Sequence, residues 1–332
     1  MPRARRRVPG LVVALLVLVG LVVASMMIGP TTIAPDAVWD ALVNPSDSIH
    51  HFAVRDFRLP RTVVGLAVGI ALGLSGALIQ ALTRNPLADP GILGVHAGAS
   101  FAVTVAVGML GVRGPENYMW FAFAGALAVT LMVLALGSTR HGQSPIVMVL
   151  AGVCVGAVLG GFREALQLTN PDAFDAMRSW NAGSILGRPL DVVWPILPFL
   201  VLGSVLAFAV SGPLNALALG DDLATSHGVK LARARVLSVL AITLLAGGAT
   251  AIAGPIGFVG LMVPHVARWI VGPDQRWIFA YSLLLAPSLL LASDILGRVV
   301  MRPGEIPVGI VTAFVGAPVL IALVRRKRVS GL

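Results

Sequence analysis

Few side chains in the apolar part of this sequence could carry chemistry. The obvious carboxylates there are Glu164, which follows Arg163, and Asp294, which precedes Arg298 by four residues. Residues four apart are neighbours on one face of a helix, so Asp294 has a basic partner within reach. A carrier driven by protons or sodium ions usually needs an unpaired acidic side chain near the middle of the bilayer. The pattern therefore disfavours an ion-gradient-driven secondary transporter but leaves it open.

The sequence also has no motif for binding a nucleotide or a metal ion. Neither of the two lysines, Lys230 and Lys327, stands in a G-x-x-x-x-G-K-[ST] pattern, so the chain does not bind ATP through a Walker motif. The six histidines include no H-E-x-x-H pair, and the single cysteine, Cys154, cannot form a paired-cysteine site. We therefore expect no catalytic residue, no metal site and no cofactor. Energy for any transport must come from a partner or from a gradient.

The composition places the chain in a lipid bilayer. Its 332 residues are 57% apolar and 12% charged, with a mean hydropathy of +0.91, so its surface is unsuited to water. A spanning helix needs roughly 20 mainly apolar residues. The sequence predicts an all-α polytopic fold with about ten transmembrane helices in one domain over residues 1–332. The predicted spans are Leu11–Ile28, Val63–Leu82, Ile92–Leu110, Met119–Leu136, Ile146–Phe162, Val192–Val210, Val236–Ala253, Ile256–Ile270, Ile278–Leu296 and Val308–Val324.

The positive charges predict how the chain is threaded through the bilayer. Arginines from Arg3 to Arg7 precede the first apolar run, and a basic cluster from Arg325 to Arg328 follows the last. Because basic residues gather on the cytoplasmic side, residues 1–9 and about 325–332 are predicted to be cytoplasmic. The net charge of +9 is not gathered as a nucleic-acid patch. The same threading leaves an excess of arginines outside that the charge rule does not explain: Arg55, Arg58, Arg61, Arg113, Arg178, Arg188, Arg298 and Arg302.

Glycine and proline interrupt two apolar regions. One break contains Asn85, Pro86, Pro90 and Gly94, and the other contains Gly254, Pro255, Gly257 and Pro264. Irregular backbone at membrane depth survives only where protein or a water-filled cavity satisfies it, so we expect these breaks to line a pathway. They follow the second and seventh spans, which indicates an inverted repeat of two helical bundles. The alternative is close helix packing without transport, which also fits glycines four apart at Gly65, Gly69 and Gly73 and at Gly152, Gly156 and Gly160.

A series of motifs runs in order from Arg58 to the carboxyl end. It includes RLPR from Arg58, SGALIQ from Ser75, NPLADPGILG from Asn85, WNAGS from Trp180, LGDD from Leu219, AGPIGFVGL from Ala253, EIPVG from Glu305 and GAP from Gly316. In these motifs the chain resembles the FecCD-type permeases of ferric-siderophore, haem and cobalamin ABC importers, which are type II importers. It is most similar to the iron-siderophore branch.

The resemblance implies a transport subunit in the cytoplasmic (inner) membrane rather than an enzyme. It would pair with a second copy or a sister permease around a central pathway. Separate ABC ATPase subunits would lie on the cytoplasmic side, and a periplasmic or lipid-anchored binding protein would deliver the ligand. The implied cargo is a ferric siderophore, with haem or cobalamin as the alternative within the family.

The resemblance also implies roles for three groups of residues. A loop at about 212–235 would couple to the ATPases through Leu219, Gly220, Asp221, Asp222, Ala224 and Gly228. A cytoplasmic gate would lie at Gln143, Ser144, Pro145 and Ile146. Arg58, Arg61 and Arg298 would dock carboxylates of the binding protein. Two alternatives stay open for these arginines: snorkelling at a helix end, and an internal pair between Arg298 and Asp294.

Overall fold

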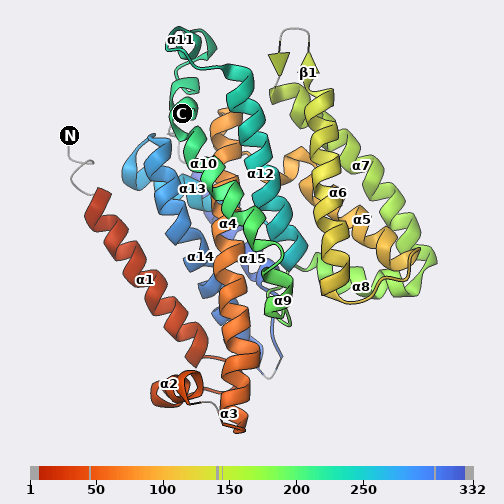
Figure 1. The fold of residues 1–332 in the computed structure, drawn as a ribbon, viewed down its shortest axis with the longest axis vertical. Coiled ribbons are helices and arrows are strands. Elements are labelled where there is room, and N and C mark those ends of the chain that lie inside the picture. Colours follow the sequence, from red (N-terminus) through yellow and green to blue (C-terminus); the bar gives the residue numbers. More distant parts are fainter. Residues whose placement is uncertain (1–6, 45, 140–141, 144, 303, 326–332) are drawn as a thin grey trace.

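The computed structural model describes residues 7–44, 46–139, 142–143, 145–302 and 304–325, and this part is almost entirely helical (Figure 1). The long and medium helices are α1 (Arg7–Met27), α4 (Leu59–Thr83), α5 (Val95–Gly108), α6 (Pro115–Leu136), α7 (Pro145–Thr169), α8 (Pro171–Asn181), α10 (Leu197–Leu217), α12 (Leu231–Ala253), α13 (Val259–Val271), α14 (Gln275–Val300) and α15 (Val308–Arg325). The shorter helices are α2 (Pro35–Val43), α3 (Ile49–Phe52), a π-helix (Ala53–Arg58), a 3-10 turn (Pro90–Leu93), α9 (Leu190–Val193) and α11 (Asp221–Ser226). Strands β1 (Ser138–Thr139) and β2 (Gly142–Gln143) form one small antiparallel hairpin, in which Ser138 pairs with Gln143.

Ten apolar helices match the ten predicted spans in order. Seven segments of the described chain are long and apolar enough to cross a membrane: α1, the continuous stretch Ile49–Thr83 that ends with α4, α6, α7, α10, α12 and α14. The shorter apolar helices α5, α13 and α15 complete the set. Two of these three follow the glycine- and proline-rich breaks. The prediction of an all-α polytopic membrane fold is confirmed.

Two predicted boundaries differ from the structure. The span predicted at Val192–Val210 is divided into α9 and α10, because Pro195 and Pro198 cannot donate backbone hydrogen bonds to a continuous helix. The loop predicted at about 212–235 is shorter, since α10 continues to Leu217 and α12 already begins at Leu231. The segment between these two helices is therefore 218–230.

Helices α4 and α12 form the centre of the bundle, and α1 and α7 lie at its periphery. Within the apolar stretch of the segment that ends with α4, 78% of the residues are buried, and within that of α12, 83% are buried. The corresponding values are 17% in α1 and 11% in α7. A peripheral helix that is apolar on all sides needs lipid or another membrane protein around it. In the monomer, the apolar surfaces of α1 and α7 are therefore exposed to lipid or to another membrane protein.

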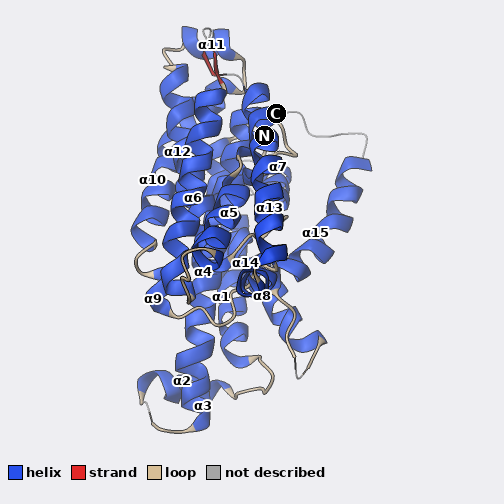
Figure 2. Ribbon diagram, turned by 90° about the vertical axis from the view of Figure 1, so that its right-hand side faces the viewer, coloured by secondary structure: helices blue, strands red, loops and turns tan. Residues whose placement is uncertain are grey.

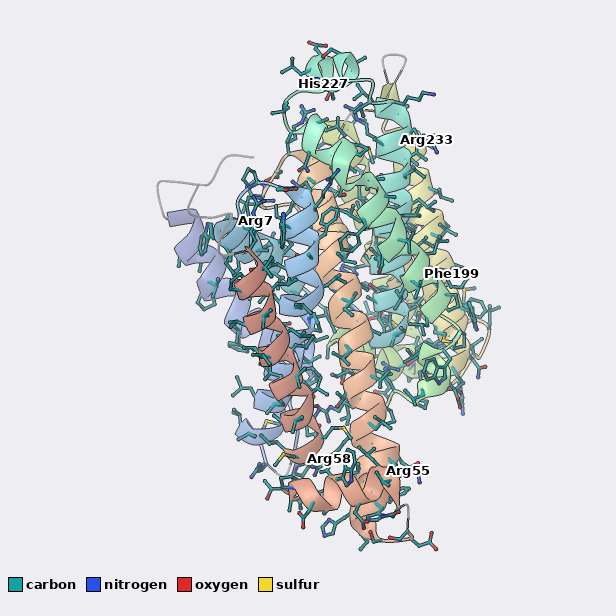
Figure 3. The ribbon with its side chains drawn as sticks, turned by 60° about the vertical axis from the view of Figure 1, so that its left-hand side comes forward. Arg7, Arg55, Arg58, Phe199, His227 and Arg233 are labelled. Carbon is teal, nitrogen blue, oxygen red and sulfur yellow. The ribbon has the colours of Figure 1, made fainter. Side chains whose placement is uncertain are left out.

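The two backbone breaks lie toward opposite ends of the bundle. Figure 1 shows α4 starting beside α3 and α12 starting beside α11, so the two central helices run in opposite directions. Figure 3 places Arg55 and Arg58 at one end of the molecule and His227 at the other, and we call these the Arg58 end and the His227 end. The break after α4 lies toward the His227 end, and the break after α12 lies toward the Arg58 end. An inverted repeat requires this arrangement, although the repeat itself stays a prediction.

The first and last helices have their outer termini on the same side of the bundle. Helix α1 begins at Arg7, which lies toward the His227 end, and α15 runs toward that same end (Figures 2 and 3). An even number of spans produces this result. Which end faces the cytoplasm stays a prediction from the charge distribution.

Candidate functional site

At the Arg58 end, Arg58 binds the end of α1. Its Nη1 donates to the carbonyl oxygens of Met26 and Met27, at 2.8 and 2.7 Å, and its Nη2 donates to that of Thr31 at 2.6 Å. The last carbonyls of a helix have no partner inside that helix, so a guanidinium group is well suited to satisfy them. Arg58 is 6% exposed, and its described partners are backbone oxygens rather than carboxylates.

Arg61 and Arg298 share the carboxylate of Asp294. Arg61 donates from Nε and Nη2 to Oδ1 of Asp294, at 3.0 and 2.6 Å, and Arg298 donates from Nε to Oδ2 at 2.9 Å. Arg61 also binds Oε2 of Glu305 through Nη1, at 2.5 Å. The internal Asp294–Arg298 pair, which the sequence left as an alternative, is therefore present.

The same network reaches α1, which joins three helices at this end. Nη1 of Arg298 donates to the carbonyl oxygens of Ser25 and Ile28, at 2.8 and 2.9 Å. Its Nη2 donates to the hydroxyl of Ser25 at 3.0 Å. Helices α1, α4 and α14 are thus held together by buried charges. Breaking one such buried pair is strongly destabilising, because the remaining charge stays uncompensated.

These side chains line a cavity of about 420 Å³ at the Arg58 end. All three predicted docking arginines reach it, so the structure brings them together around one site. The lining contains four arginines and two carboxylates: Arg58, Arg61, Arg188, Arg298, Asp56 and Glu305. Even with Asp294 included, arginines outnumber carboxylates. The sequence did not identify Arg188 or Glu305 as members of this site, because nothing in local spacing connects them with Arg61.

At the His227 end, the predicted coupling residues surround the short helix α11. Leu219 and Leu223 project from the surface, with 65% and 52% of their area exposed, whereas Ala224 is fully buried. Gly220 and Gly228 flank the helix with φ angles of 112° and 80°, which L-residues with a side chain rarely adopt. The segment therefore forms a compact, protruding turn with an apolar tip (Figure 3).

Asp221 attaches this turn to two long helices. Its carboxylate accepts hydrogen bonds from Arg84, just after α4, and from Arg235 in α12, the latter at 2.5 Å. Partial burial acts to raise the pKa of Asp221, but the hydrogen bonds and charges of Arg84 and Arg235 outweigh it and lower this pKa. Asp221 is therefore ionised at neutral pH. The neighbouring Asp222 is exposed.

The break after α4 is built from side-chain caps. Arg84 adopts a left-handed conformation with φ 51°, and Oδ1 of Asn85 accepts from the amide of Leu87 at 2.9 Å, across Pro86. Oδ1 of Asp89 accepts from the amide of Gly91 at 2.8 Å, just after Pro90. Gly94, with φ 78°, then starts α5. These local bonds satisfy backbone that leaves helical geometry.

The break after α12 is packed against the loop that follows α8. Gly254 has φ 75°, and a Cβ on it would lie 2.3 Å from the carbonyl oxygen of Trp180. The amide of Ser184 donates to the carbonyl oxygen of Ala253 at 2.8 Å. Phe258, after Pro255 and Gly257, has φ 68°, which is uncommon for a bulky residue and indicates local strain.

Pro264 does not interrupt a helix, so that part of the prediction is wrong. It lies inside α13, where its missing amide leaves the carbonyl of Gly260 without its usual helical donor. Nε2 of the fully buried Gln80 donates to the carbonyl oxygens of Gly260 and Leu261, at 3.4 and 2.9 Å. A side chain from α4 thus supplies the donor, as is common for proline in membrane helices.

The predicted gate falls partly outside the described residues. Ser144 is not described, Gln143 ends strand β2, and Pro145 begins α7. Ile146, in the first turn of α7, is 73% exposed. The structure therefore leaves the gate untested.

The comparisons with known proteins agree with this architecture. The model of the FecCD transport family matches residues 15–326. The ferric enterobactin transport system permease protein FepD of Escherichia coli (strain K12) is 48% identical over 326 residues, which cover 98% of this chain and 96% of FepD. The Fe(3+)-citrate import system permease protein YfmD of Bacillus subtilis (strain 168) is 40% identical over 291 residues, covering 88% of this chain and 85% of that protein.

A solved structure shows the same fold. A transporter of the metal-chelate ABC type, in an inward-facing conformation, superposes with a TM-score of 0.82 at 28% identity, covering 95% of this chain and 98% of that chain. Ten apolar helices in the described residues, two internal breaks and near-complete coverage by these relatives lead to one conclusion: the chain belongs to the FecCD transport family, as a multi-pass membrane permease.

Proposed function

We propose that the chain is the permease subunit of an ABC importer that carries a ferric siderophore across the cytoplasmic membrane. The observation that carries this proposal is the 48% identity to a ferric enterobactin permease over nearly the whole of both chains. The chain has no Walker motif, so ATP would be hydrolysed by separate ATPase subunits. The proposal includes a second permease, either a copy of this chain or a sister subunit.

The turn around α11 is the proposed contact with the ATPases. The exposed Leu219 and Leu223 offer an apolar tip, and Asp221 connects α11 to Arg84 and Arg235. Movement of α11 would therefore be passed directly to the ends of α4 and α12. Because α4 and α12 are the most buried spans, a push at this turn reaches the centre of the permease. This assignment places the His227 end in the cytoplasm, together with both chain termini.

The arginine-lined cavity is the proposed docking site for the binding protein. Arg61 and Arg298 already bind Asp294 and Glu305, whereas Arg58 contacts backbone carbonyls and its charge is not cancelled by a bound carboxylate in the described part of the chain. An arginine fork can hold a carboxylate bidentately and stays charged at any working pH. Carboxylates projecting from a periplasmic or lipid-anchored binding protein would therefore be attracted to this end.

The two breaks and the start of α7 are the proposed pathway and gate. Gly257 in the second break is exposed, and Ile146 projects from α7 at the His227 end. In a pair of permeases, equivalent segments would face each other across the pathway. Cysteine at Ser144 in a Cys154→Ala background should then form a crosslink between permeases when the inner mouth is closed. If no nucleotide state permits this crosslink, the gate lies elsewhere.

One buried carboxylate supports this proposal over a gradient-driven carrier. Asp294 is 1% exposed and is the fully buried acidic residue of the described chain, but it is bound by both Arg61 and Arg298. A carboxylate held between two guanidinium groups is poorly suited to take up and release a proton. Among the described residues, the one fully buried carboxylate is therefore not a free acidic relay.

Reconstitution tests the proposed function. Proteoliposomes with the permease pair, its ATPases and its binding protein should take up ferric enterobactin only when ATP is present on the ATPase side. Vesicles with the permease alone and an imposed proton or sodium gradient should take up none. Gradient-driven uptake without ATPases would overturn the importer assignment, and uptake of haem or cobalamin in place of the ferric siderophore would overturn the cargo.

Charge reversal tests the docking site. Arg58→Glu should weaken binding of the binding protein, and a matched Glu→Arg change on that protein should restore part of the affinity. Because Arg58 also holds the end of α1, the thermal stability of the variant must be measured alongside. Loss of affinity without any restoration by a matched reversal would show that Arg58 acts only on the fold.

A further inference from the structure

Helix α2 has an apolar flank that no described part of the chain covers. Trp39 is 70% exposed and Leu42 is 43% exposed. The buried face of the same helix, with Val38 and Ala41, packs in a cluster with Met26 at the end of α1. At about 100° per residue, Leu42 lies about 40° and Trp39 about 100° around the helix from Val38, so these two side chains form a flank beside the packed face. The helix therefore has one broad apolar surface, of which the part with Val38 and Ala41 is packed and the flank with Trp39 and Leu42 is open.

The polar flank of α2 is turned toward α3. Oδ2 of Asp40 lies 3.4 Å from Nε2 of His51 in α3. Figures 1 and 2 show α2 and α3 together beyond the ends of the other helices, with α2 across the end of α1. Asp40 is thus directed to its own chain, although its side chain stays 55% exposed, and the flank of Trp39 and Leu42 is directed elsewhere.

The length of α1 gives the position of the bilayer boundary at this end. Helix α1 has 21 residues, of which few are buried, and is about 31 Å long at 1.5 Å per residue. The hydrocarbon core of a bilayer is about 30 Å thick, so Met27 lies close to its boundary. Arg58 binds the carbonyl oxygens of Met26 and Met27 and therefore marks the same level.

Distances along the neighbouring helical segment then place α2 and α3. Val54, which packs against α2, precedes Arg58 by four residues of the π-helix, a distance of less than about 6 Å along the axis. Ile49 in α3 precedes Arg58 by nine residues, or about 13 Å. The headgroup region adds only about 5–7 Å on each side of the hydrocarbon core. Helix α2 consequently lies at headgroup level, whereas Ile49 lies beyond it.

We propose that α2 is an interfacial helix whose Trp39–Leu42 flank binds the lipid headgroup region at the Arg58 end. Tryptophan prefers this region because its ring is apolar and its N–H can still contact water or headgroups. An amphipathic helix there lies in the plane of the membrane. The exposed apolar surface of α1 continues into α2 after a short link. Lipid contact at α2 braces the junction at which Met26, Val54 and Arg58 meet, and so steadies the mouth of the arginine-lined cavity.

Spin labels on the full-length permease in nanodiscs test this placement. In a Cys154→Ala background, a nitroxide is attached to Leu42→Cys or, as the matched control, to Ile49→Cys, which replaces a residue 85% exposed. The Leu42 label should show an oxygen-to-nickel accessibility ratio several-fold higher than the Ile49 label, because oxygen concentrates in the bilayer and a polar nickel complex stays in water. Equal ratios at the two positions would overturn the proposal.

Tryptophan quenching provides a second measurement that needs no label on α2. The permease and its Trp39→Phe variant are compared in nanodiscs of phosphatidylcholine and phosphatidylglycerol with bromine on the acyl chains. The emission lost in the variant, which reports Trp39, should be quenched by the brominated lipid. Unquenched Trp39 emission would contradict lipid contact. Immobilisation of the Leu42 label only after addition of the binding protein would instead assign this flank to protein docking and overturn the proposal.

Discussion

Arg61 and Asp294 are 233 residues apart in the sequence, yet Nε and Nη2 of Arg61 bind the same carboxylate oxygen of Asp294 at 3.0 and 2.6 Å. Arg298 binds the other oxygen at 2.9 Å, and Nε of Arg61 also reaches that oxygen, at 3.0 Å. This arrangement connects α4 to α14 at the Arg58 end. It also removes the buried carboxylate from any role as a free proton carrier.

Replacing Asp294 should unfold the permease more readily than any change at an exposed acid. Asp294→Leu leaves Arg61 and Arg298 buried without their shared partner, which should cost about 3–5 kcal/mol. Thermal unfolding of the purified protein in detergent measures the loss. Asp172→Asn is the control, because the Asp172 side chain is 73% exposed and its pair with Arg113 is long, at 3.4 Å. Equal melting temperatures for the two variants would contradict the prediction.

A double substitution should recover part of that loss. Arg61→Met with Asp294→Leu removes one positive and one negative charge from the network of Arg61, Asp294, Arg298 and Glu305. Its remaining charges are those of Arg298 and Glu305. Replacing a buried ion pair by apolar residues of similar size is often neutral or stabilising. We therefore expect the double variant to melt above Asp294→Leu alone. If the effects of the two single changes simply add, the pair does not interact as described.

Asp221→Asn should loosen α11. It removes the carboxylate that binds Arg84 and Arg235, and exposed pairs of this kind are each worth about 0.2–1 kcal/mol. Hydrogen exchange of the α11 amides should become faster, and ATP hydrolysis should be less tightly coupled to uptake. Asp222→Asn, at the exposed neighbouring position, is the control and should change neither. Identical exchange in the two variants would contradict the connecting role of Asp221.

The pH dependence of this effect follows from the lowered pKa of Asp221. A carboxylate with a depressed pKa in the folded state contributes stability above its unfolded pKa, about 3.9, and this contribution is lost as the pH falls through the folded value. The difference between Asp221→Asn and the unmodified protein should therefore stay constant from about pH 5 to 8. A difference that shrinks between pH 7 and 6 would show that another group titrates here.

Gly228 should tolerate asparagine better than alanine. Its φ is 80°, and a Cβ on it would meet no atom within 4 Å, so the requirement inside this chain is conformational rather than steric. A left-handed conformation costs an ordinary L-residue about 1–2 kcal/mol, whereas asparagine adopts it more readily. ATP-driven uptake should fall with Gly228→Ala and be largely retained with Gly228→Asn. An equal loss of uptake in both variants would mean that contact with a partner subunit, rather than the backbone angle, requires glycine at this position.

Gly69 and Gly160 both belong to runs of glycines four residues apart, but replacement by valine should change stability at only one of them. A Cβ on Gly69 would lie 2.4 Å from Cα of Pro287 in α14, whereas a Cβ on Gly160 would meet no atom within 4 Å. Gly69→Val should lower the thermal stability of the isolated permease by about 1–3 kcal/mol or more. Gly160→Val should leave it unchanged. Similar losses in both would contradict the packing of α4 against α14.

The sequence alone was sufficient for the membrane class, the number of apolar helices and the positions of both breaks. These features depend on local properties. One is the length of an apolar run, and the other is the tendency of clustered glycine and proline residues to end a helix. Pro264 shows the limit of such reasoning. Helix α13 continues through it, and the donor for the carbonyls of the preceding turn is the side chain of Gln80, which comes from another helix.

The arginines at the Arg58 end show what only the tertiary structure decided. The Asp294–Arg298 pair was readable from helical spacing, since residues four apart share a helix face. The contacts of Arg61 with Asp294 and Glu305, and of Arg58 with the end of α1, were not readable. Likewise, the glycines of α4 and α7 have the same spacing, but a Cβ on Gly69 of α4 would clash with α14, whereas one on Gly160 of α7 would meet no atom within 4 Å. Contacts between distant segments depend on how whole helices pack. The spacing of residues within one segment does not specify which other segment lies against it.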